Sequence, residues 1–249
     1  MGLREFDYGP LVSVERGTEV TTRERKRQWN ELRPLFMRTR MVSHAAGSSY
    51  LEAENSKVIC SVNGPLANTG GRTEAIERAK ISCYISRTKF CGLEDDELEK
   101  RATTEYEGIV CRALESIVRV EQYPKSTIEV HVLVIEDDGS TLSAAITCAC
   151  LALADAKIEL RELMACCSVV NANGQLLLDP TLDEEKEASG SVLVSYLATS
   201  GKVSTVFQTG QLAYDEMAQA VELTISGARE IAVLVRNCLR QRESKDRGL

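Results

Sequence analysis

The sequence predicts an α+β protein, in which short β-strands come in hairpin groups separated by helices. Short alternating apolar runs end at Gly and Asn turns, and two long segments show apolar residues at helical spacing. The 249 residues are 43% hydrophobic and 27% charged, a composition typical of a chain with a sizeable core. Regular strand-helix-strand alternation is absent, which argues against a doubly wound fold. The length fits one large domain or two small ones.

The first part of the chain is expected to form strands with one helix among them. The β-branched and alternating runs predict strands at residues 35–43, 48–53, 57–62, 80–89 and 128–135. Apolar residues recur at helical spacing between Tyr106 and Val118, and Tyr123-Pro124 closes that amphipathic helix. Residues 1–30 are polar and contain a basic cluster, which predicts an N-terminal arm before a domain spanning residues 31–240.

The second part begins at an acidic turn, Glu136-Asp137-Asp138-Gly139-Ser140, and continues into a helix at residues 142–156 made of small side chains. Such side chains let a helix pack very close to a sheet. Further strands are expected at residues 165–170, 175–178, 191–197 and 202–208, with an acidic loop at 179–187. A last helix at about residues 213–240 precedes a charged tail, residues 241–249.

Charge and composition exclude several classes of function. The chain carries 30 Lys and Arg against 37 Asp and Glu, a net charge of −7, so a uniformly basic nucleic-acid surface is not expected. The net charge does not exclude a local basic groove. The longest uncharged run, residues 139–154, is too short and too rich in Ser, Thr and Ala to span a membrane. The first twenty residues lack an apolar signal segment, which predicts an intracellular protein with nine reduced, mostly buried cysteines.

Two segments are candidates for chemistry. The turn at Gly139-Ser140-Thr141 places backbone N–H groups at a helix N-terminus, where an anion can bind, although a plain tight turn explains the residues equally well. It lacks the spacing and the lysine of a P-loop. The acidic loop from Asp179 to Glu185 offers oxygen ligands for Mg²⁺, whereas acidic runs are more often solvated loops. With two histidines in the chain, a nucleophile triad has little support.

Several segments, in order, resemble the RNase PH family, and specifically the RNase PH-like ring subunits of the eukaryotic RNA exosome. The segments are Glu31-Leu32-Arg33-Pro34, Ala46-Gly47-Ser48-Ser49-Tyr50-Leu51-Glu52, Val58-Ile59-Cys60-Ser61-Val62-Asn63-Gly64-Pro65, Tyr123-Pro124-Lys125, Leu151-Ala152-Leu153-Ala154-Asp155-Ala156 and Leu177-Leu178-Asp179-Pro180-Thr181. Within the family, Leu-Leu-Asp-Pro-Thr followed by glutamates resembles the Mtr-type branch, named for messenger-RNA transport defects.

The resemblance implies an RNase PH-like fold, a single domain of two mixed β-sheets with flanking helices. It also implies a place in a six-membered ring with other RNase PH-like exosome subunits, capped by RNA-binding subunits, in the nucleus, the nucleolus and the cytoplasm. RNA is then the other partner, and neither a cofactor nor a membrane is expected.

The resemblance also implies where catalysis would lie. Active family members degrade RNA from its 3′ end, with inorganic phosphate as the nucleophile held by arginines. The two arginine positions fall on Ala102 and Leu142, and the aspartate pair falls on Asp179 and Glu185. Leucine has no hydrogen-bond donor, so we expect an inactive, architectural subunit without a metal site.

Three basic residues are expected to face RNA in the channel of such a ring: Arg72, Arg78 and Lys80. Two alternatives stay open. The chain is an active phosphate-dependent exoribonuclease if Arg101, next to Ala102, supplies a cation together with Asp179 and Glu185. It is an unrelated small-molecule enzyme if the Gly139 turn binds a phosphate group.

Overall fold

The structure is a computed structural model of the whole chain. It describes the backbone of residues 27–67, 78–88 and 96–246, and the side chains of the same residues except 96–102 and 243–246. Arg72, Arg101 and Ala102 therefore have no described side chain, and Arg72 lies wholly outside the described residues. No helix among the described residues is both long enough and apolar enough to cross a membrane.

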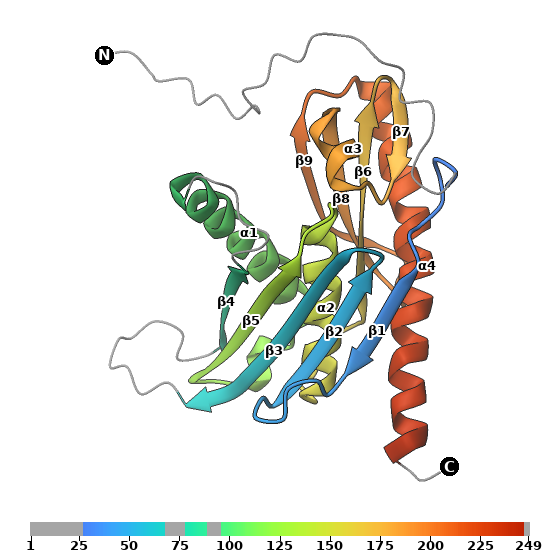
Figure 1. Cartoon of the computed structure of the whole chain (residues 1–249). Coiled ribbons are helices and arrows are strands. Elements are labelled where there is room, and N and C mark those ends of the chain that lie inside the picture. The colour runs from blue at the N-terminus through green and yellow to red at the C-terminus, as the bar shows by residue number, and fades with distance from the viewer. Residues whose placement is uncertain (1–26, 68–77, 89–95, 247–249) are drawn as a thin grey trace.

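The first sheet, sheet 1, has five strands in the order β1-β2-β3-β5-β4 (Figure 1). Its strands are β1 (Leu35–Thr39), β2 (Gly47–Ala53), β3 (Ser56–Ala67), β4 (Lys80–Arg87) and β5 (Ser126–Glu136). The β4–β5 pair is parallel and the other pairs are antiparallel. Sheet 1 is thus mixed, as expected, with β1 and β4 as its two edges.

The second sheet, sheet 2, has four strands in the order β7-β6-β8-β9, and every pair in it is antiparallel. Its strands are β6 (Met164–Ala172), β7 (Gln175–Leu178), β8 (Ala188–Leu197) and β9 (Val203–Gly210). The expectation of two mixed sheets therefore holds for sheet 1 and not for sheet 2. The difference follows from connectivity: every connection in sheet 2 is a short hairpin or a short helix, and short connections join antiparallel strands.

Helix α2 (Thr141–Asp155) lies between the two sheets and contacts β2 and β3 on one side and β6 on the other (Figure 1). Its residues are almost all buried, and most are Ala, Cys, Ser or Thr, which let both sheets approach closely. A Cβ atom added to Gly47 would lie 2.2 Å from the backbone nitrogen of Ala156, just past the end of α2. The small-residue helix predicted from the sequence is therefore the central layer of the molecule.

The remaining helices cover the outside. Helix α1 (Asp96–Ile117) packs on β4, a short 3₁₀ turn η2 (Val120–Gln122) follows it, and α4 (Tyr214–Asp246) packs on the far face of sheet 2 and on β1. The face of sheet 1 turned away from α2 carries no helix among the described residues (Figure 1). The eight described cysteines form no disulfide, and burial raises the pKa of Cys148 to about 12, which makes that thiol unreactive.

The structure departs from the expected boundaries at three places. Residues 179–187 were expected to form a loop, but α3 (Leu182–Lys186) lies within them, started by a capping box between Thr181 and Glu184. Residues 27–30, expected to belong to the arm, contact the domain: the Trp29 carbonyl accepts the Leu178 N–H at 2.8 Å. Helix α4 continues to Asp246, into the expected tail, because the charged residues there are good helix formers.

Candidate functional site

A cleft of about 380 Å³ lies between the two sheets at the N-terminus of α2. Sheet 1 and α1 contribute Arg87 and Tyr106 to it, and sheet 2 contributes Phe207 and several serines. The turn before α2, the first turn of α2 and the end of α3 complete the lining with Asp137, Ser140, Leu142 and Glu185. The cleft thus contains two of the four positions that the resemblance assigned to catalysis, Leu142 and Glu185.

The turn before α2 is held in an unusual backbone conformation. Gly139 has φ +80° and Ser140 has φ +54°, both in the left-handed region. A Cβ on Gly139 would come within 2.5 Å of the carbonyl carbon of Thr181, so only glycine fits there. The Arg33 guanidinium fixes the turn from behind by donating to the carbonyls of Asp138 at 2.8 Å and of Gly139 at 3.1 Å.

The backbone N–H groups of this turn are bound by the protein's own carboxylates. Ser140 N–H donates to Oε1 of Glu185 at 2.8 Å, and Gly139 N–H donates to Oδ1 of Asp137 at 3.2 Å. The Thr141 hydroxyl also donates to Asp137. A helix N-terminus attracts anions, and here protein carboxylates take that place. Two N–H groups of the turn that the sequence offered as an anion cradle, those of Gly139 and Ser140, are therefore taken by the protein's own carboxylates.

Arg87, at the end of β4, is a cation of the cleft that the sequence analysis missed. Its Nη1 donates to Oδ2 of Asp137 at 2.7 Å, and its guanidinium lies over the Tyr106 ring, 5.8 Å from the ring centre. Both side chains of the pair are mostly buried. An arginine at a strand end gives no signal in the sequence, because only the fold shows which residues it faces.

Asp179, the first of the two mapped carboxylates, is buried in a network of arginines. Its Oδ1 accepts from Nη2 of Arg33 at 2.7 Å, and its Oδ2 accepts from the backbone N–H of Arg33 at 3.0 Å. Arg27 donates to the Asp179 carbonyl at 3.1 Å. Burial by itself raises the pKa of this carboxyl, but the Arg33 guanidinium outweighs burial and holds the pKa below its ordinary value. Asp179 therefore carries a charge that Arg33 neutralises.

Glu185, the second mapped carboxylate, has its pKa shifted in the opposite direction, upward. Its pKa is raised to about 7: burial is the largest cause and the charges of Asp137 and Asp179 add to it, while the Ser140 N–H and Arg33 lower the pKa. Near neutral pH its carboxyl group is thus protonated in a large fraction of molecules. A protonated carboxylic acid and an arginine-paired aspartate are a poor ligand pair for a divalent cation.

The described residues contain no group of three His, Cys, Asp or Glu side chains placed to hold a metal ion. The Mg²⁺ reading of the acidic segment therefore has no support from its geometry. The reading of that segment as a solvated loop is also wrong, since Asp179 and Glu184 are buried. The physical reason is Arg33, which brings Asp179 into the core.

Of the remaining predicted site residues, only Leu142 is described as lining the cleft; the others lie apart from it or have no described side chain. Leu142 lines the cleft with an apolar side chain and offers no hydrogen bond. Ala102 lies on α1, whose backbone is described there but whose side chain is not. Arg78 and Lys80 are exposed at the start of β4. They lie at the end of β4 opposite to Arg87, so they belong to a different surface from the cleft.

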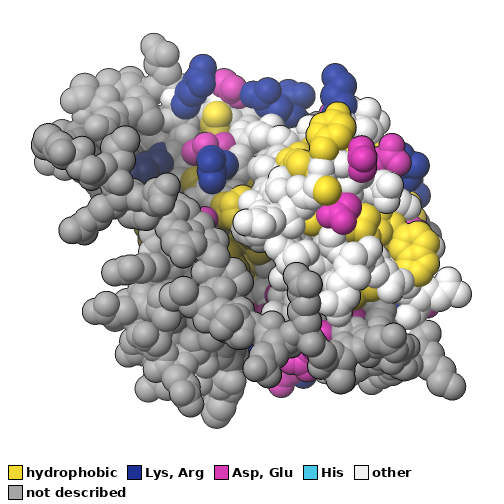
Figure 2. Space-filling model, turned by 90° about the horizontal axis from the view of Figure 1, so that it is seen from above, with side chains coloured by type: hydrophobic (Ala, Val, Ile, Leu, Met, Phe, Trp, Pro, Cys, Tyr) yellow, Lys and Arg dark blue, Asp and Glu magenta, His cyan; other side chains and the backbone are white. Residues whose placement is uncertain are grey.

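The charges on the surface are mixed. Figure 2, a view from the end of the molecule where β7, α3 and β9 lie, shows basic and acidic side chains interspersed, with hydrophobic side chains between them. No uniformly basic face is visible there, in agreement with the net charge of −7.

Two sheets on a shared central helix, with a polar cleft at that helix's N-terminus, form an architecture of two parts, and two family models match these parts in order. The family model described as the 3′ exoribonuclease family, domain 1, matches residues 31–159, and the model of its domain 2 matches residues 162–227. The first match corresponds to sheet 1 with α1 and α2, and the second to sheet 2 with the first part of α4. The chain belongs to this family, the RNase PH family.

Relatives with similar sequences carry exosome names. The chain is 34% identical over 236 residues to the human "Exosome complex component MTR3", covering 87% of this chain and 85% of the relative. It is 31% identical to "Exosome complex component mtr3" of Schizosaccharomyces pombe, covering 98% of both chains. It is 32% identical to "Exosome complex component RRP41-like" of Arabidopsis thaliana, covering 88% and 84%.

Solved structures agree on the fold. The crystal structure of rice (Oryza sativa) Rrp46 superimposes with a TM-score of 0.74 at 25% identity, covering 84% of this chain and 96% of that one. An Archaeoglobus fulgidus exosome chain superimposes with a TM-score of 0.72 at 16% identity, covering 85% and 91%, a likeness of fold alone. The RNase PH-like α+β fold expected from the sequence is confirmed.

Proposed function

We propose that this chain is a non-catalytic subunit of the core ring of an RNA exosome. It would complete the ring and the channel through which RNA passes, and so serve 3′-to-5′ RNA processing and decay, including the processing of ribosomal RNA. The relatives named as exosome components, with 31% and 34% identity over most of the chain, support the assignment to an exosome.

The observation that carries the non-catalytic part is the hydrogen bond from the Ser140 N–H, at the N-cap of α2, to the carboxyl group of Glu185. Phosphorolysis needs a bound phosphate nucleophile and cations that neutralise it. In the cleft Leu142 offers no donor, Ser140 N–H is bound to Glu185, and the Arg87 guanidinium is paired with Asp137. A phosphate entering the cleft would meet carboxylates at the place where it needs donors.

The partners and the location of the chain follow from the same proposal. The partners are other RNase PH-like subunits in a ring of six, RNA-binding cap subunits, and RNA. Arg72, Arg78 and Lys80 would face RNA in the channel, and the complex would work in the nucleus, the nucleolus and the cytoplasm. The exposure of Arg78 and Lys80 at the edge of sheet 1 is compatible with this role.

The second candidate is an active phosphate-dependent exoribonuclease. One observation favours it: Arg87 places a guanidinium inside the cleft, near the carboxyl group of Glu185, although the sequence analysis found no such cation. Displacement of Arg87 from Asp137 by substrate would then supply one of the two cations that Leu142 and Ala102 lack.

An RNA degradation assay tests the proposal directly. The full chain, alone and after mixing with its sister ring subunits, is incubated with end-labelled RNA, with and without phosphate and Mg²⁺. We expect the chain to be incorporated stably into a ring. We also expect that it causes no phosphate-dependent release of nucleoside diphosphates. A ring containing the Arg87→Gln variant is the matched control. Phosphate-dependent shortening that disappears with Arg87→Gln would establish the second candidate.

The channel residues have their own test. Arg78→Gln and Lys80→Gln are expected to lower crosslinking of RNA in the assembled ring, and Arg112→Gln, an exposed arginine on α1, is the control. Arg72→Gln is tested in the same way. Crosslinking that stays at the level of the control in all three variants would remove these residues from the channel.

A further inference from the structure

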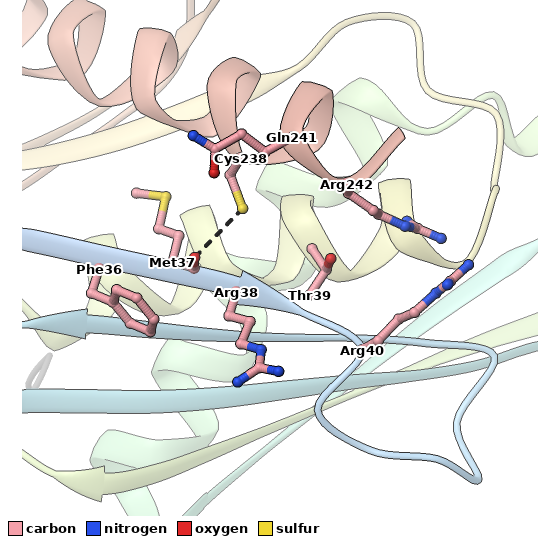
Figure 3. Close-up of a pocket in the computed structure, with 8 residues that line it drawn as sticks. All are labelled: Phe36, Met37, Arg38, Thr39, Arg40, Cys238, Gln241 and Arg242. Carbon is pink, nitrogen blue, oxygen red and sulfur yellow. Dashed lines mark hydrogen bonds between the residues drawn. The ribbon is translucent and has the colours of Figure 1, made fainter. Parts of the chain in front are cut away.

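A groove runs along the β1 edge of sheet 1, between β1 and the C-terminal part of α4 (Figure 3). It consists of two hollows of about 530 and 580 Å³, and both are lined by Arg40 and Arg242. The second hollow continues past the C-terminal end of α2, where Asp155 and Lys157 lie. None of the lining residues belongs to the cleft at the other end of α2. We call this surface the β1–α4 groove.

The β1–α4 groove is basic in a chain that is acidic overall. Four cationic side chains line it, Arg38, Arg40, Lys157 and Arg242, against a single carboxylate, Asp155, among its described lining residues. The whole chain has a net charge of −7, so this excess is local. A surface of one sign inside a hollow concentrates the electrostatic potential and attracts ligands of the opposite sign.

Asp155 explains why two of these cations lie close together. Its carboxylate is buried, accepts the Ser48 N–H at 2.9 Å and forms ion pairs with Arg242 and, at 4.0 Å, with Arg40. Arg40 has φ +60°, a left-handed conformation that is rare for a side-chain-bearing residue. Figure 3 shows its side chain turned from the end of β1 toward Arg242 on α4. The fold therefore holds two guanidinium groups, from distant parts of the sequence, around one carboxylate.

An aromatic pair lies beside these cations on the uncovered face of sheet 1. The Phe36 side chain is 55% exposed, and its ring packs edge to face on Tyr50 with 6.3 Å between ring centres. Tyr50 is directly opposite Arg38 in the β1–β2 register. Glu52 accepts the Tyr50 hydroxyl and is the nearby carboxylate on this face. Cationic grooves with an exposed aromatic ring are typical of proteins that bind single-stranded nucleic acids.

We propose that the β1–α4 groove binds the phosphate backbone of single-stranded RNA, at the edge of sheet 1 opposite to the β4 edge where Arg78 and Lys80 lie. Arg40, Arg38 and Lys157 would contact successive phosphates, Arg242 would stay paired with Asp155 and add to the positive potential, and Phe36 would stack on a base. The need for a polyanion follows from the groove itself, whereas the choice of RNA rests on the proposed function.

An acidic peptide is the other polyanion to consider, and the groove fits it less well. A peptide that adds to the β1 edge needs the outward-facing backbone groups of that strand. The Cys238 thiol of α4 already donates to the Met37 carbonyl at 3.6 Å, so the helix blocks the middle of the edge. RNA needs only the cations and an exposed ring face, and both are present.

The test is RNA binding by the purified full chain, measured by fluorescence anisotropy with a labelled single-stranded oligouridylate at several salt concentrations. The groove variant is Arg38→Gln/Arg40→Gln, which leaves Arg242 on the buried Asp155. The control variant is Arg112→Gln/Arg119→Gln, which removes the same charge from exposed arginines near α1. Circular dichroism verifies that both fold. A second pair, Lys157→Gln against Lys125→Gln, compares two exposed lysines that share a left-handed backbone, with φ +58° and +57°.

We expect the groove double variant to weaken RNA binding about tenfold at low salt and to reduce the slope of log K against log salt by about 1.4, as loss of two phosphate contacts predicts. The control double variant should stay within about twofold of the parent chain. Equal effects of groove and control variants, in both pairs, would overturn the proposal. So would a groove variant that keeps RNA binding but loses binding of poly-glutamate. The measurement does not need the ring, so it gives its answer even where ring assembly fails.

Discussion

The two ends of helix α2 carry opposite charges. At its N-terminus, Glu185 accepts the Ser140 N–H and Asp137 accepts the Gly139 N–H. Past its C-terminus, Arg40 and Arg242 surround Asp155, with Lys157 next to them. A helix dipole favours negative charge at the first end and positive charge at the second, so the chain neutralises both ends with its own side chains.

This difference bears on the proposed non-catalytic role of the chain. A carboxylate at the N-terminus of α2 competes with phosphate for the same N–H groups, whereas the arginines near the C-terminal end leave a basic groove accessible to solvent. In the first region the Arg87 cation is already paired with Asp137, whereas in the second the cations outnumber the described lining carboxylate. Both regions suit a protein that guides RNA and does not cut it.

The largest expected effect comes from Arg33→Ala. This change leaves the buried Asp179 carboxylate without its main cation and releases the carbonyls of the turn before α2. Removal of one partner from a buried ion pair costs about 3–5 kcal/mol of unfolding free energy. Urea denaturation followed by circular dichroism measures it. The exposed control Arg112→Ala should change stability by less than about 0.5 kcal/mol, and a similar loss in both variants would contradict the assigned network.

The contact of β2 with the C-terminal end of α2 is tested by Gly47→Ala. The new Cβ would lie 2.2 Å from the Ala156 nitrogen and 2.5 Å from the Ala152 carbonyl oxygen, so backbone has to move. We expect a loss of about 1–3 kcal/mol. Gly108→Ala on α1, where no atom lies within 4 Å of the new Cβ, should instead stabilise the chain by up to about 1 kcal/mol. Thermal unfolding of both variants measures these two effects. A Gly47→Ala variant as stable as the parent chain would contradict the close contact between β2 and the C-terminal end of α2.

The pH dependence of stability tests the state of Glu185. Its pKa is raised to about 7 from an ordinary value of 4.5, so between these pH values the folded chain binds more protons at this site than the unfolded chain. Stability from this group is therefore largest below about pH 4.5 and is lost as pH rises to about 7. Glu185→Gln should be more stable than the parent at pH 8, by on the order of 1–3 kcal/mol, and the difference should shrink toward pH 5.

Other titrating groups are removed from that experiment by subtraction, since only the difference between the two chains is followed with pH. The opposite sign is expected at Asp179: its pKa is lowered, so its stabilisation is present at neutral pH and is lost as pH falls through the folded pKa. A parent-minus-variant difference that stays constant from pH 5 to pH 8 would mean that Glu185 titrates normally.

The smallest effect concerns phosphate itself. We expect 10 mM phosphate to raise the melting temperature of the chain by less than about 1 °C relative to chloride of equal ionic strength, because a ligand at or below its Kd adds at most about 0.4 kcal/mol. Leu142→Arg should increase that shift by adding a guanidinium to the cleft, and Leu142→Met is the apolar control. A larger shift in the parent chain than in Leu142→Arg would place phosphate somewhere other than the N-terminus of α2.

Much of the fold could be predicted from the sequence because its signals are local. The alternating strands and the small-residue helix after Ser140 lie where the pattern placed them, within a few residues, whereas the helix expected from Tyr106 begins ten residues earlier, at Asp96. The predictions that were wrong concern segments in which tertiary contacts outweigh composition. Acidic residues 179–187 were expected to form a solvated loop, but Arg33 draws Asp179 into the core and a capping box starts α3.

In the candidate site, too, the sequence predicted some features and tertiary contacts decided others. The sequence located Leu142, Asp179 and Glu185 through the resemblance to a family, and Leu142 alone indicated a missing donor. It could not show that Arg33 neutralises Asp179, that burial keeps Glu185 partly protonated, or that Arg87 faces Asp137. Each of these facts depends on which residues from separate elements meet in space.

The sequence by itself therefore determined the α+β class and the family, and it led to the expectation that Leu142 leaves a phosphate anchor missing, since periodicity, turn residues and residue identity are written along the chain. The tertiary structure alone decided the protonation state of the two carboxylates and the joining of Arg40 with Arg242 around Asp155. The physical reason is that burial and through-space charge set the pKa of a group and the potential of a groove. Both depend on residues up to 202 positions apart, as Arg40 and Arg242 are.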